Sequence, residues 1–78
     1  MISNYTIGRI ETEIARITKV LPEVYTRENS KNLLVIFQKE IPSVEETAKI
    51  HDALKEFGNP VKTEYRDNNY VSFLILKN

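Results

Sequence analysis

The residues that could do chemistry in this 78-residue chain are few, and they form no catalytic pattern. There is one histidine, His51, and no cysteine, so a thiolate nucleophile and a cluster of imidazole metal ligands are both excluded. Asp52 follows His51 directly, but neighbouring side chains on a helix point in different directions and do not form an acid–base pair. We therefore expect His51 to be a partly buried packing residue.

The hydroxyl and carboxylate groups give no stronger signal. Four serines lie outside any nucleophile-elbow or triad pattern: Ser3, Ser30, Ser43 and Ser72. The acidic residues at 11, 13, 45 and 46 are typical of solvated helix faces and helix starts rather than of paired catalytic carboxylates. Gly8 and Gly58 are the only glycines, so no glycine-rich phosphate cradle can form. The sequence thus predicts a non-enzymatic protein without a cofactor or metal site.

Charge and hydropathy exclude further classes of function. Eleven basic and eleven acidic residues cancel, whereas a nucleic-acid-binding protein usually carries a basic excess. No apolar run approaches the ~20 residues that a membrane span needs. The first five residues lack the basic and apolar regions of a signal peptide, and the absence of cysteine fits a reducing compartment. We therefore expect a cytoplasmic protein with no membrane partner.

The hydrophobic pattern predicts two helices and four strands. Five apolar residues recur at three- and four-residue steps before Pro22, as in an amphipathic helix: Ile7, Ile10, Ile14, Ile17 and Leu21. A second helix begins at Ser43, which can form a capping box with Glu46, and it ends before Gly58, where we expect a left-handed residue. The predicted strands cover residues 23–28, 33–38, 61–67 and 70–77.

This order of elements, αββαββ, predicts a single α+β domain over residues 1–78. It is the ferredoxin-like order with its first strand moved to the end. In that layout the second and fourth strands form the centre of a four-stranded antiparallel sheet, and both helices cover one face. The strongly apolar second and fourth strands agree with central positions, and the charged first and third strands agree with edges. A fold of this kind carries no function with it.

The strand register decides which side chains line the uncovered face. We expect a four-residue loop in the first hairpin and a two-residue Asn68–Asn69 loop in the second. The expected uncovered side chains are Leu34, Ile36, Val71, Phe73 and Ile75 at the centre, with Tyr25, Arg27, Lys62 and Arg66 around them. A slip of one residue would exchange the two faces of a strand. Alternatively, the long side chains of Tyr25, Lys62 and Arg66 could fold over the centre and cover it.

An apolar uncovered face on so small a domain predicts protein binding. The partner is either a second copy, which would give a homodimer, or a different protein that this chain inhibits or regulates. The alternative is a single-stranded nucleic acid stacked on Phe73, with Tyr25, Arg27, Lys62 and Arg66 beside it. The zero net charge and the aliphatic residues around Phe73 argue against that alternative.

Overall fold

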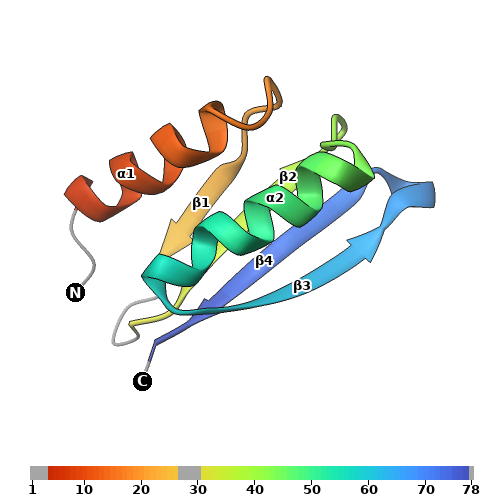
Figure 1. Ribbon diagram of the computed structural model, residues 1–78. Coiled ribbons are helices and arrows are strands. Elements are labelled where there is room, and N and C mark those ends of the chain that lie inside the picture. Colours follow the sequence, from red (N-terminus) through yellow and green to blue (C-terminus); the bar gives the residue numbers. More distant parts are fainter. Residues whose placement is uncertain (1–3, 27–30, 78) are drawn as a thin grey trace.

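The computed structural model describes residues 4–26 and 31–77 and confirms the order αββαββ (Figure 1). Its helices and strands are α1 (Asn4–Ala15), β1 (Glu23–Thr26), β2 (Leu33–Gln38), α2 (Val44–Leu54), β3 (Asn59–Tyr65) and β4 (Tyr70–Leu76). Two short 3-10 turns, Lys55–Phe57 and Arg66–Asn68, flank β3. No helix in these described residues is long and apolar enough to cross a membrane.

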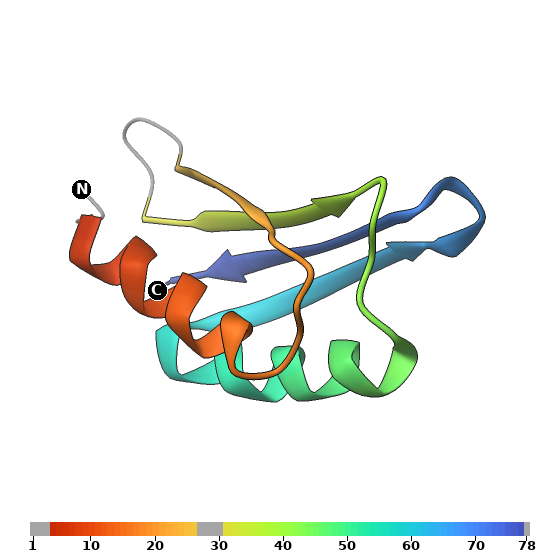
Figure 2. The same cartoon turned by 90° about the horizontal axis from the view of Figure 1, so that it is seen from above.

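The four strands form one antiparallel sheet in the order β1-β2-β4-β3, as predicted. Figure 2 shows both helices on the same side of the sheet, which confirms the expected two-layer arrangement. The central strands β2 and β4 pair along their length, from Leu33 opposite Ile75 to Gln38 opposite Tyr70. One face of the sheet is therefore covered by helices, and the other carries no layer of the described chain.

The core lies between the helices and the covered face of the sheet. Burial alternates along β2, where Leu33, Val35 and Phe37 are at most 1% exposed while the residues between them are half-buried. The rest of the core consists of Ile10, Ile14, Ile50, Leu54, Phe57, Val71, Phe73 and Ile75. The rings of Phe37 and Phe73 meet edge to face, with their centroids 6.4 Å apart, at the middle of this layer.

Helix α2 begins with the predicted capping box. The Ser43 hydroxyl accepts from the Glu46 amide at 3.1 Å, and the Glu46 carboxylate accepts from the Ser43 amide at 2.9 Å. After Leu54 the chain continues through the Lys55–Phe57 turn to Gly58, which has a φ of 150° and a ψ of −154°. This is an extended conformation with positive φ, not the left-handed helical conformation that we expected. It is one that glycine adopts most readily.

Helix α1 is shorter than the apolar stripe predicted. It ends at Ala15, and the amides of Ile17 and Thr18 both donate to the Ile14 carbonyl as the chain turns away. Ile17 still packs against the core from outside the helix, but Leu21 is 83% exposed. The periodic spacing therefore continued past the residues that actually form the helix.

The β3–β4 hairpin differs from the prediction in both its loop and its faces. Its loop has four residues rather than two, because Tyr65 pairs with Tyr70 and the Arg66–Asn68 turn precedes Asn69 in the left-handed conformation. The face assignment of these strands was wrong, although that of β2 was correct. The expected uncovered residues Val71, Phe73 and Ile75 are fully buried beneath the helices.

Candidate protein-interaction surface

The structure places three candidate residues on the face predicted for them, although the pairing of Thr26 with Leu33 differs by two residues from the register that a four-residue loop would give. Tyr25 and Leu34 pair across β1 and β2, and Ile36 follows two residues later on the same face. Tyr25 is 49% exposed, while Leu34 and Ile36 are half-buried. These side chains lie on the face of the sheet that the helices leave uncovered.

The other candidate residues do not join them. Val71, Phe73 and Ile75 belong to the core, so they cannot contact a partner. Lys62 pairs with Phe73, which places it on the helix-covered face, and Arg66 contacts the start of α2. Arg27 lies outside the described residues. The predicted face was therefore correct for the described candidate residues of β1 and β2 and wrong for those of β3 and β4.

The strand register defines the surface that is actually uncovered, which we call the open face. Its described members are Glu23, Tyr25, Leu34, Ile36, Gln38, Asn59, Val61, Thr63, Tyr65, Tyr70, Ser72, Leu74 and Leu76. They form cross-strand rows, because paired residues of neighbouring strands point to the same side. The first row is Tyr25, Leu34, Leu74 and Val61; the second is Glu23, Ile36, Ser72 and Thr63; the third is Gln38, Tyr70 and Tyr65.

The first row gives the open face its apolar character. Leu74 is 38% exposed and Val61 44%, values that are high for aliphatic side chains on a sheet. Ser72, next to Leu74 on the central strand, is only 5% exposed, because it is small and its neighbours in the sheet are larger. The open face thus has a prominent leucine beside a small, nearly covered serine.

Charge is almost absent from the open face. Glu23, at the β1 corner, is its only charged member within the described strands. The Tyr25 hydroxyl donates a hydrogen bond to the Glu23 carboxylate, and this contact raises the pKa of Tyr25. The remaining described members are aliphatic, aromatic or neutral polar residues, which is an unusual composition for a chain with 28% charged residues.

A pair of tyrosines forms the end of the open face near the β3–β4 loop. The rings of Tyr65 and Tyr70 lie 6.0 Å apart at an angle of 45°. They line a shallow hollow together with Gln38, Lys39, Asn68 and Asn69. Tyr65 is 60% exposed, so much of this ring surface is available to a partner.

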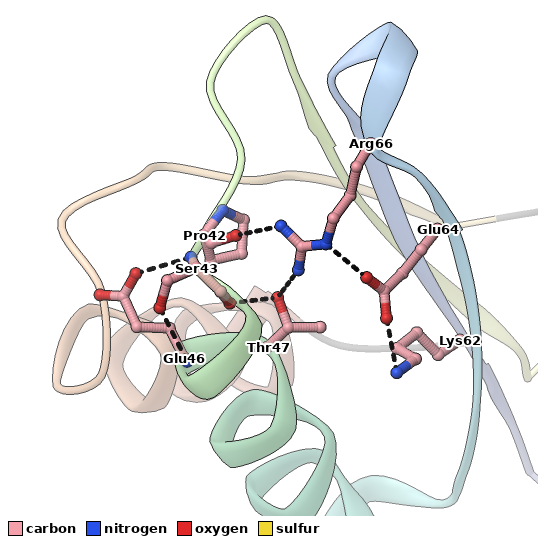
Figure 3. Close-up of polar contacts among 7 residues, drawn as sticks. All are labelled: Pro42, Ser43, Glu46, Thr47, Lys62, Glu64 and Arg66. Atoms are coloured by element: carbon pink, nitrogen blue, oxygen red, sulfur yellow. Dashed lines mark hydrogen bonds and ion pairs between the residues drawn. The ribbon is translucent and has the colours of Figure 1, made fainter.

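The charged residues of β3 lie on the opposite side, in a polar cluster with the start of α2 (Figure 3). The Arg66 guanidinium donates from Nε to Glu64 at 2.7 Å, from Nη1 to the Pro42 carbonyl at 3.1 Å, and from Nη2 to the Thr47 hydroxyl at 3.1 Å. Glu64 also pairs with the Lys62 ammonium, at 2.6 Å. This cluster fixes the end of β3 against the N-terminus of α2.

These contacts also explain why the pKa of Glu64 is lowered. The hydrogen bond from Lys62 is the largest cause that lowers the pKa of this carboxyl, and the bond from Arg66 adds to it against the opposing effect of burial. Because the carboxylate lies between two cations, its charge is compensated locally, and the cluster keeps a single net positive charge. All three side chains retain some exposure to solvent, so they can lie on the helix-covered side without a large desolvation cost.

The side chains that we considered as possible catalytic groups make structural contacts. His51 is half-buried, its Nε2 donates to the Pro60 carbonyl at 3.2 Å, and its ring lies 6.3 Å from that of Phe73. The Ser43 hydroxyl serves as the cap of α2. Within residues 4–26 and 31–77, no three side chains of the metal-ligating types come together.

The open-face residues of β3 and β4 were not predicted from the sequence: Asn59, Val61, Thr63, Tyr65, Tyr70, Ser72, Leu74 and Leu76. One signal could have found them. Val71, Phe73 and Ile75 are all strong strand formers, whereas the alternate set of β4 contains Ser72, so the first set is the better core-facing one. Comparisons with protein-family models, with curated proteins and with solved structures found no significant match to this chain.

Proposed function

We propose that this chain is a small non-enzymatic protein-interaction module that binds another protein through the open face. The observation that carries this proposal is a largely apolar surface that extends over all four strands, with Glu23 as its one charged member in the described strands. The centres of protein interfaces are depleted in charge and enriched in aromatic residues, as this surface is. Tyr25, Tyr65 and Tyr70 are suitable anchors, because tyrosine buries a large area and keeps a polar group.

Regulation or inhibition of the bound protein fits such a module. The Ser43 hydroxyl and the His51 imidazole, which were weighed as possible catalytic groups, already have structural hydrogen-bond partners. The residues that would act on a partner are therefore the contact surface itself. A module of this kind works by occupying or covering a surface of its partner.

The proposal can be tested by affinity capture from the source cell with three forms of the chain. Leu74→Glu places a charge at the centre of the open face, whereas Leu21→Glu changes an exposed leucine outside it. We expect the wild type and Leu21→Glu to retain the same partner, and Leu74→Glu to lose it. Binding of the purified partner should weaken at least tenfold on Leu74→Glu, since a buried unpaired charge costs several kcal/mol. Equal binding by all three forms would contradict the proposal.

Nucleic acid is the rival class of partner, and three of the residues that would support it are not on the open face. Phe73 is 0% exposed, and Lys62 and Arg66 lie on the covered face beside Glu64. The described open-face rings on which bases could stack are Tyr25 and the pair of Tyr65 and Tyr70. We expect no mobility shift with single-stranded RNA or DNA at low salt. A salt-sensitive shift that Tyr65→Ala abolishes would favour the rival class instead.

A further inference from the structure

We infer that the partner of the open face is a second copy of this chain, packed face to face about a two-fold axis. This inference rests on the proposed function and names the protein that covers the open face. The axis would run across the strands and pass over β4 between Ser72 and Leu74. Each Leu74 would then lie on Ser72 of the other copy. The small charge of the open face, its exposed area and its pattern of large and small side chains support this arrangement.

The charge on the open face favours a copy of itself over a charged partner. Complementary charges steer partners together and reject wrong ones. Glu23 at a corner is the only charge among the described members of this face, so it offers little electrostatic selection. Two such faces, in contrast, meet with Glu23 at the corner as the one charged group of the described strands that association would desolvate. The zero net charge of the chain also leaves little repulsion between copies.

The area of the open face matches what a dimer needs. The exposed parts of its side chains amount to on the order of 600 Å², if a fully exposed large side chain has about 200 Å². Two copies would then bury about 1,200 Å² in total, which is the lower limit of the range for stable interfaces. A 78-residue domain has a thin core, so this added burial would also stabilise the fold.

The pattern of large and small side chains selects the axis. Rotation about an axis across the strands, midway between Ser72 and Leu74, exchanges the first two rows of the open face. Leu34 then lies on Ile36 of the other copy, and Val61 on Thr63. The same rotation places Tyr70 on Leu76 of the other copy.

The other simple arrangement has its axis along the strands and fits less well. It would place Leu34 of one copy against Leu74 of the other, so that two large side chains collide in one row. It would also leave Tyr65 beyond the short strand β1, which has only four residues. Aligned packing of two sheets, about 10 Å apart, needs large side chains of one sheet to fit between those of the other. The axis across the strands meets this need at the centre of the interface, because each Leu74 lies on the small Ser72 of the other copy. Leu34 and Ile36 then face each other to one side of that centre.

The oligomeric state is the first test. Light scattering during gel filtration should give twice the 9.1 kDa mass of the chain for the wild type and for Leu21→Glu. Leu74→Glu should be monomeric at the same concentration, with a dissociation constant at least tenfold higher. A wild type that stays monomeric at roughly 100 μM would overturn the dimer, because that affinity is too weak for a specific assembly.

Disulfide cross-linking tests the position of the axis. The chain has no cysteine of its own, so each disulfide can form only between the introduced residues. Ser72→Cys and Leu74→Cys chains, one of them tagged, are mixed and oxidised. We expect the mixed covalent dimer to form faster than either like dimer, and Leu21→Cys to give little product. Preferential linkage of Leu34→Cys to Leu74→Cys would overturn this axis in favour of the one along the strands.

These results separate the two levels of the argument. A monomeric wild type that still captures a different protein, and loses it on Leu74→Glu, would refute the dimer and leave the proposed function standing. A monomeric wild type that captures nothing through the open face would refute both. A dimer that Leu74→Glu does not affect would show that copies associate elsewhere, and would refute this inference.

Discussion

Substitution of Arg66 by methionine should destabilise the fold more than the loss of any other surface arginine in the described chain. Arg66 is only 31% exposed, and its three hydrogen bonds join β3 to the β2–α2 connection and to α2 (Figure 3). Methionine keeps much of the apolar stem of the side chain. The substitution therefore removes the polar contacts with little change in packing.

The size of the effect follows from these three contacts. Loss of the charge-assisted hydrogen bond to the Pro42 carbonyl should cost about 1.5 kcal/mol. The pair with Glu64 should add below about 1 kcal/mol, because both side chains keep some exposure to solvent. The Thr47 hydroxyl still donates to the Ser43 carbonyl at 2.7 Å, so its loss of Arg66 adds little. We expect a decrease of about 2 kcal/mol in the free energy of unfolding.

Urea denaturation and thermal melting measure this effect directly. For a domain of this size, 2 kcal/mol corresponds to a fall in Tm of roughly 8 to 16 °C. Arg16→Met is the matched control, because Arg16 is 71% exposed and its pair with Glu13 lies on the surface of α1. It should change stability by less than about 0.5 kcal/mol. All forms must be compared at one protein concentration, since association would add to the stability of each.

The result that would refute this reasoning is a loss of stability no larger for Arg66→Met than for Arg16→Met. Such a result would mean that water replaces the guanidinium at the Pro42 carbonyl without cost. Arg66→Lys is a useful intermediate, because lysine keeps the charge but cannot reproduce the fork of donors. We expect it to recover less than half of the lost stability.

The remaining predictions concern backbone conformation, capping and pH. Gly58→Ala should lower the free energy of unfolding by about 2 kcal/mol or more, because φ is positive and a Cβ would lie 2.7 Å from the Leu76 carbonyl oxygen; an unchanged urea midpoint would contradict this. Ser43→Ala should cost about 1 kcal/mol by removing the α2 cap, and helicity by circular dichroism would report any fraying. The pKa of Glu64 is held below its ordinary value of 4.5. The ionised carboxylate therefore contributes to the free energy of unfolding above pH 4.5, and this contribution is lost as the pH falls through the lowered pKa. Glu64→Gln should therefore flatten the decline in stability between neutral pH and about pH 3, and identical pH profiles would refute this.

The fold could be predicted from the sequence because several independent signals agreed. The apolar run identifies β2, and the capping box at Ser43 and the stop near Gly58 mark the two ends of the helical segment that begins with α2. The order of those elements then leaves few arrangements of an antiparallel sheet. The hydrophobic inner strands identified the central pair without any information from a relative.

The open face could be predicted only in part, and the reason is physical. Placing Val71, Phe73 and Ile75 in the core forces Lys62 and Glu64 onto the helix-covered face, because pairing fixes which residues share a side. The sequence analysis expected the opposite side, with Lys62 and Arg66 on the uncovered face. The ion pairs of Glu64 with Lys62 and with Arg66, which lies beyond the end of β3, are tertiary contacts that the pattern of apolar residues does not show.

That cluster also determines the character of the open face. Edge strands are usually charged, which discourages association. Strand β3 carries its charges, but they point toward α2, where Arg66 and Lys62 flank Glu64. The same strand therefore presents Val61 and Tyr65 to the other side. The contacts that fix β3 to the helix layer thus leave the open face free of charge across β2, β3 and β4, so reversing the charged side of β3 would remove the surface on which the proposed dimer depends.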